Sequence, residues 1–74
     1  MTALAERVRA AKLPAPAVRR SIRLGAGVTL AEMAAELDVT PVTVLRWERG
    51  SSEPRRARAI AYRRLLDAVR EASS

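Results

Sequence analysis

Apolar residues recur every three or four positions along most of the chain, and β-branched residues nowhere alternate with polar ones. This spacing is typical of amphipathic α-helices, whereas a half-buried strand alternates at every second residue. We therefore expect an all-α protein, a compact bundle of about five short helices. The expected organisation is a single domain over residues 1–74, with an N-terminal helix in 1–13, a helical core in 15–50 and a C-terminal helix in 54–72.

Two prolines separate the first two expected helices. The first helix covers about residues 2–12 and ends before Pro14, because a residue that precedes proline avoids the helical region. Pro16 suits the first turn of the second helix, where a backbone amide has no helical partner in any case. Val18 and Ile22 are expected to face inward from this second helix.

The third and fourth expected helices are separated by a very short turn. Thr29 and Glu32 have the spacing of a capping box, in which each side chain accepts a hydrogen bond from an unpaired backbone amide. Asp38 ends this third helix, and Thr40 begins the fourth as its N-cap residue. Gly50 is the expected stop, since glycine readily adopts the left-handed conformation that follows many helices.

The fourth helix is expected to be amphipathic, with Val44 and Trp47 facing inward. Its opposite, outward side carries Val42, Leu45, Arg46 and Arg49.

The last helix has an apolar arc much wider than the ~100° that one core requires. The residues of this arc are Ala57, Ala61, Tyr62, Leu65, Leu66, Ala68 and Val69. We therefore expect part of this surface to contact a second copy of the chain in a homodimer.

The charge of the chain is strongly positive and points to a polyanionic partner. Fourteen Lys and Arg residues against 8 Asp and Glu residues give a net charge of +6. All of the basic residues except Lys12 are arginines, whose planar guanidinium suits phosphate groups and guanine edges.

The missing residue types exclude other functions. Without Cys or His, the chain has no thiol nucleophile, no imidazole base and none of the usual zinc ligands. The acidic residues are scattered, so we expect no metal site, no cofactor, no small-molecule ligand and no enzyme activity. No apolar run approaches the ~18 residues of a membrane span. Since no cleavable leader is recognisable either, we expect a soluble cytoplasmic protein without membrane association.

Two short helices joined by a tight turn form either a DNA-binding unit or a plain packing unit. The stretch from Ile22 to Pro54 carries a characteristic set of residues, namely Arg23, Gly27, Val28, Thr29, Ala34, Val39, Thr40, Val44, Trp47, Glu48, Gly50 and Pro54. In these residues the chain resembles the Cro/cI-type helix-turn-helix proteins, also called the XRE family. The resemblance implies a lambda-repressor-like fold and binding to double-stranded DNA.

The resemblance also assigns roles within this stretch. It implies that Arg23 pairs with Glu48 and that Ala34 is small because two helices cross closely there. Asp38 departs from the family, since many members place glycine at this position. Aspartate tolerates the left-handed conformation better than most residues, so we expect the turn to form.

The residues expected to contact DNA come from the same resemblance and from the positive charge. Those that the resemblance places in the major groove or beside phosphate are Thr40, Pro41, Val42, Thr43, Leu45 and Arg46. Among them, Arg46 is the strongest candidate for base recognition, because an arginine can donate two hydrogen bonds to guanine. The expected phosphate contacts are Arg19, Arg20, Arg49, Arg55, Arg56 and Arg58.

The resulting hypothesis is a transcription regulator, a Cro-like, phage-type or autoregulating repressor without a sensor domain. Residues 39–48 also look like the motif of MerR-like and excisionase-like proteins, which follow it with a β wing. A third alternative, from another class, is a protein-interaction module that uses the C-terminal helix.

Overall fold

Five α-helices and no strand make up the computed structural model, which describes residues 2–74. The helices are α1 (Ala3–Ala10), α2 (Pro16–Gly25), α3 (Leu30–Leu37), α4 (Pro41–Arg49) and α5 (Arg56–Ala72). The expected all-α bundle is therefore confirmed. The last helix begins slightly later than expected, because Arg55 takes the extended conformation of an N-cap residue.

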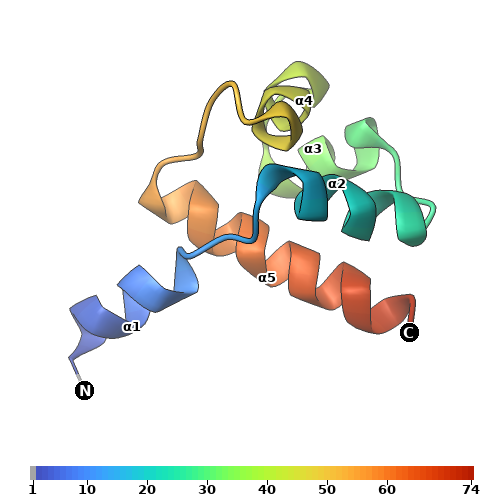
Figure 1. Cartoon of the computed structure of the whole chain (residues 1–74). Helices are drawn as coiled ribbons and strands as arrows, with labels where there is room; N and C mark the ends of the chain where they lie inside the picture. Colours follow the sequence, from blue (N-terminus) through green and yellow to red (C-terminus); the bar gives the residue numbers. More distant parts are fainter. Residues whose placement is uncertain (1) are drawn as a thin grey trace.

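The helices α2, α3 and α4 lie together on one side of the long helix α5 (Figure 1). Contacts join α3 to α4, α2 to α4, and both α2 and α3 to α5. Helix α1 contacts α5 but no other helix, and it projects from one end of the bundle. None of the described helices is both long enough and apolar enough to cross a membrane.

The hydrophobic core lies where α3, α4 and α5 meet. Its members are Met33, Ala34, Leu37, Val44, Trp47, Tyr62 and Leu66, all buried. The rings of Trp47 and Tyr62 pack at a centroid distance of 5.1 Å. A packed aromatic pair of this kind adds about 0.5–1.5 kcal/mol to the stabilisation from area burial. The buried face of α4 therefore packs into this core.

Local hydrogen bonds determine where α3 begins and ends. The Thr29 hydroxyl accepts a hydrogen bond from the Glu32 amide at 3.0 Å, and the Glu32 carboxylate accepts one from the Thr29 amide at 2.9 Å. These two bonds confirm the capping box, and the bond from the Thr29 amide lowers the pKa of Glu32. At the other end, Asp38 takes a left-handed conformation with φ 54° and ends the helix.

An arginine from α5 completes the C-terminal end of α3. Arg58 donates hydrogen bonds to the carbonyl oxygens of Leu37 and Asp38, at 2.6 and 3.0 Å. These carbonyl groups have no partner within the helix itself. Arg58 therefore has a structural role at the end of α3, in addition to the phosphate contact expected from the sequence.

Two expectations about apolar side chains were wrong or incomplete. Val18 does not face inward, because α2 turns this residue away from the core and leaves it 40% exposed. The wide apolar arc of α5 is partly covered within the chain, since α1, α2 and α3 all pack against this helix. Within the arc, Tyr62 and Leu66 are buried, whereas Leu65 and Val69 are half-buried.

Candidate nucleic-acid interface

Helix α4 has one buried face and one exposed face. Val44, Trp47 and Glu48 are buried on the inner side. On the outer side Val42 is 52% exposed, and Arg46 is exposed one turn later. The other residues of α4 expected at the interface are Pro41 and Arg49, which are exposed, and Thr43 and Leu45, which are half-buried. The outer face is thus mixed in character, with aliphatic, hydroxyl and guanidinium groups.

The N-terminal end of α4 is fixed by two threonines. The Thr40 hydroxyl accepts a hydrogen bond from the Thr43 amide at 3.2 Å, and the two threonine hydroxyls lie 2.9 Å apart. Pro41 occupies the first turn, where its missing amide hydrogen costs nothing. A helix N-terminus carries partial positive charge, so this end of α4 favours an anionic group nearby.

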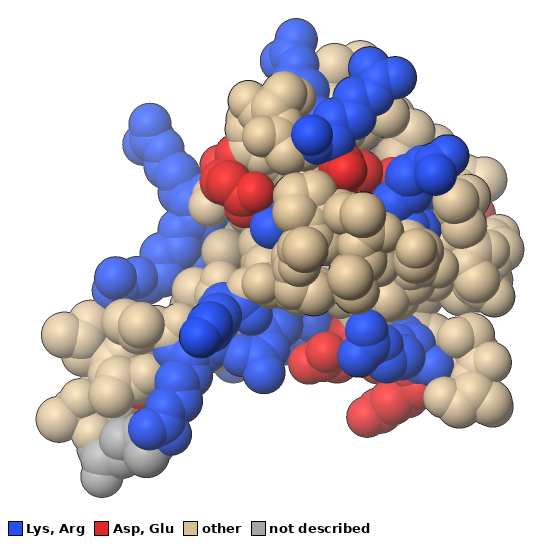
Figure 2. Space-filling view, in the orientation of Figure 1, with Lys and Arg blue, Asp and Glu red and all other residues tan. Residues whose placement is uncertain are grey.

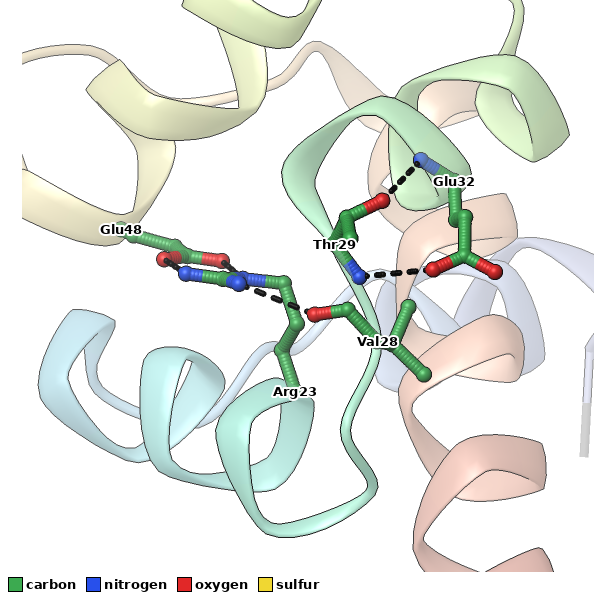
Figure 3. A network of polar contacts seen from close by, with 5 residues as sticks. All are labelled: Arg23, Val28, Thr29, Glu32 and Glu48. Carbon is green, nitrogen blue, oxygen red and sulfur yellow. Dashed lines mark hydrogen bonds and ion pairs between the residues drawn. The ribbon is translucent and has the colours of Figure 1, made fainter.

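An ion pair between α2 and α4 fixes the angle of α4 (Figure 3). Arg23 donates from Nε to Glu48 Oε2 at 2.6 Å and from Nη2 to Glu48 Oε1 at 2.9 Å. Its third hydrogen bond goes to the carbonyl oxygen of Val28 at 3.0 Å. The pairing implied by the resemblance is therefore confirmed. The hydrogen bonds to Glu48 raise the pKa of Arg23, so the arginine stays charged.

Arg19 was expected to contact phosphate, and the structure contradicts this. The side chain is buried, and its guanidinium donates to Pro14 O at 2.8 Å, Trp47 O at 3.1 Å and Glu53 Oε2 at 3.0 Å. These bonds join α2 to the end of α4 and to the loop that follows. Because its donors are used within the chain, Arg19 is a structural residue.

The other basic residues of the expected interface are exposed. Arg20, Arg46, Arg49, Arg55 and Arg56 form no side-chain hydrogen bond or ion pair with any residue in the range 2–74. Figure 2 shows Lys and Arg side chains projecting from the region of α4 and from the start of α5. These guanidinium groups are available to an external anion.

Sequence reasoning missed the structural use of Arg19 and the double hydrogen bond of Arg58. Their carbonyl acceptors on Trp47 and Leu37 are distant in the sequence, at separations of 28 and 21 residues. No local motif marks such a contact. Within residues 2–74, no group of three or more acidic, His or Cys side chains could hold a metal ion.

Comparison with known proteins agrees with this geometry. A family model described as helix-turn-helix matches residues 20–72, from within α2 to the end of α5. The match covers well over half of the chain and leaves α1 outside. No curated protein and no solved structure matches the chain significantly. Residues 2–74 contain no strand, so the wing expected of a MerR-like protein is not found there.

Proposed function

Because this chain belongs to the Cro/cI-type (XRE) helix-turn-helix family, whose members are DNA-binding transcription regulators, we propose that it is a sequence-specific repressor that acts as a homodimer. The observation that carries the proposal is the mixed outer face of α4, held in a fixed orientation by the ion pair of Arg23 with Glu48. Helix α4 enters the major groove of duplex DNA, and α3 lies across it beside the backbone.

Base recognition is assigned to Arg46. This side chain is exposed on the outer face of α4 and makes no hydrogen bond or ion pair with any residue in 2–74. Two parallel hydrogen bonds to guanine O6 and N7 discriminate against other bases by about 1–3 kcal/mol. Val42, one turn earlier and 52% exposed, is suited to contact a thymine methyl group.

Phosphate contacts are assigned to basic residues that flank α4. Arg20 lies on α2, Arg49 ends α4, Arg55 directly precedes α5, and Arg56 begins it. These side chains are exposed, and the hydroxyl of Thr40 adds a neutral group at the start of α4. Phosphate contacts position a protein on the duplex without reading its sequence.

Repression is proposed to follow from occupancy of the promoter. A two-fold dimer of such domains reads two half-sites about one helical turn apart. A regulator bound in this way excludes polymerase from an overlapping site.

Selection of bound sites from random duplex DNA tests the proposal. We expect an inverted repeat with at least one guanine in each half-site. A pool that shows no enrichment after several rounds would contradict sequence-specific binding, whereas a single unrepeated half-site would contradict the dimer only.

A further inference from the structure

Helix α1 carries apolar side chains that its own chain leaves largely uncovered. Leu4 is 53% exposed and Val8 is 49% exposed, and no residue of α1 is buried. Arg7 and Arg9 lie on the same helix, and Lys12 follows it, against one acidic residue in this segment. The N-terminal segment is therefore a short amphipathic helix with net positive charge.

A groove of about 500 Å³ lies between α3 and the second half of α5. Its apolar lining includes Val28, Met33, Leu65 and Val69, and Glu32 and Glu36 contribute acidic groups. A smaller hollow of about 150 Å³ shares Val28 and Val69 and continues the groove toward the end of α5. In a chain of net charge +6, this combination of apolar surface with two carboxylates is unlike the basic DNA-contacting side.

We propose that the groove between α3 and α5 receives helix α1 of a second copy of the chain. The occupant is identified by complementarity: the groove is apolar with carboxylates, and α1 is apolar with guanidinium groups. The chain's own α1 does not fill the groove, because it contacts α5 alone and does not reach α3. This inference rests on the homodimer of the proposed function and is independent of DNA binding.

A two-fold axis can satisfy both copies at once. Helix α1 lies beside the first half of α5, where Arg63 donates to the carbonyl oxygen of Arg9 and Arg7 lies near Arg56 and Ile60. The groove lies along the second half, at Leu65 and Val69. In a two-fold dimer of this kind, each α1 occupies the groove of the partner. Such a contact is closed and buries the same surfaces twice.

Disulfide trapping tests this pairing directly, because the chain contains no cysteine. One copy carries Val8→Cys and the other, made heavier by a tag, carries Ala35→Cys, a substitution at an exposed residue that lines the groove. Any bond between the two is then intermolecular. We expect this mixed product to exceed, several-fold, the product of Val8→Cys with the loop control Ser52→Cys. An equal yield, or a dominant product between two Val8→Cys chains, would overturn the proposal.

A charge variant supplies a second readout by sedimentation. Val8→Asp is expected to weaken the dimer at least tenfold, whereas Val18→Asp, a matched change at an exposed valine of α2, leaves it unchanged. A dimer that persists in Val8→Asp overturns this interface and leaves the homodimer intact. A wild-type chain that stays monomeric at high concentration overturns both this interface and the homodimer. The occupant of the groove is then a basic helix from another protein. Neither result bears on whether site selection enriches a DNA sequence at all, which reports DNA binding separately.

Discussion

Arg23 and Glu48 form a buried, two-bond ion pair that joins α2 to the C-terminal half of α4. The pair holds both residues on the inner side of α4, while the outer side remains free. Since a helix in the major groove must be aimed within a narrow range of angles, we expect this pair to determine whether the outer face can bind DNA. It contributes no base contact of its own.

Replacing Arg23 with alanine is expected to destabilise the fold. The Glu48 side chain is only 1% exposed, and a buried charge without its partner typically costs about 3–5 kcal/mol. Urea unfolding followed by circular dichroism measures the change, with Arg49→Ala as an exposed control. The double variant Arg23→Met with Glu48→Leu should recover much of the loss. An unchanged urea midpoint for Arg23→Ala would show that the pair contributes nothing to stability.

Arg19 and Arg20 are adjacent in α2 but are expected to act differently. Arg19→Ala removes three hydrogen bonds to the chain and should lower the melting temperature. Arg20→Ala leaves the fold unchanged and should reduce the salt dependence of DNA binding by about one phosphate contact. Thermal melts and binding titrations of both variants measure these effects. If Arg19→Ala melts like the wild type, the structural role assigned to Arg19 is wrong.

The buried Tyr62 hydroxyl predicts a loss of stability at alkaline pH. Burial raises the pKa of Tyr62 to about 12, whereas an unfolded tyrosine ionises near pH ~10. The folded state thus favours the neutral phenol. The stabilisation that comes from this preference is fully present below about pH 10 and is lost as the pH rises toward 12. The melting temperature of the wild type should fall more steeply across this window than that of Tyr62→Phe.

The same variant, Tyr62→Phe, tests whether the hydroxyl destabilises the fold at neutral pH. Tyr62 Oη makes no hydrogen bond with any residue in 2–74, and an unsatisfied buried hydroxyl costs about 1–3 kcal/mol. Tyr62→Phe should therefore be at least as stable as the wild type at pH 7. A marked destabilisation would mean that the hydroxyl has a stabilising partner.

The proposed function assigns base recognition to Arg46 and phosphate contact to Arg55. Arg46→Ala should abolish the preference for one guanine in each half-site, because this side chain lies on the outer face of α4. Arg55→Ala should weaken binding to all sequences about equally, since Arg55 precedes α5. Site selection repeated with each variant distinguishes the two. Equal weakening for every sequence in Arg46→Ala would make that residue a phosphate contact.

Much of the fold could be predicted because its determinants are local. Thr29 with Glu32, and Thr40 with Thr43, are three residues apart, so their caps are visible in the sequence. The pair of Arg23 with Glu48 spans 25 residues and was expected only through the family resemblance.

The remaining features depend on contacts that no local pattern contains. An arginine that donates to distant carbonyl groups, such as Arg19, has the same sequence appearance as a solvated one. Helical spacing shows that Leu4 and Val8 share a face of α1, but it does not show whether another element covers that face. In the structure, Arg19 is buried, and α1 contacts α5 but no other helix.

Sequence-specific DNA binding is tested most directly by titrating the protein onto two duplexes, one with the selected site and one scrambled, at salt concentrations of about 50 to 200 mM. Fluorescence anisotropy gives the affinity at each concentration. We expect tighter binding to the selected duplex by about 10³-fold or more at equal salt. We also expect affinity for both duplexes to fall steeply, by about 10³-fold or more over this range, as phosphate contacts from both copies are screened. Equal affinity for the two duplexes, or an affinity that does not change with salt, would contradict the proposed function.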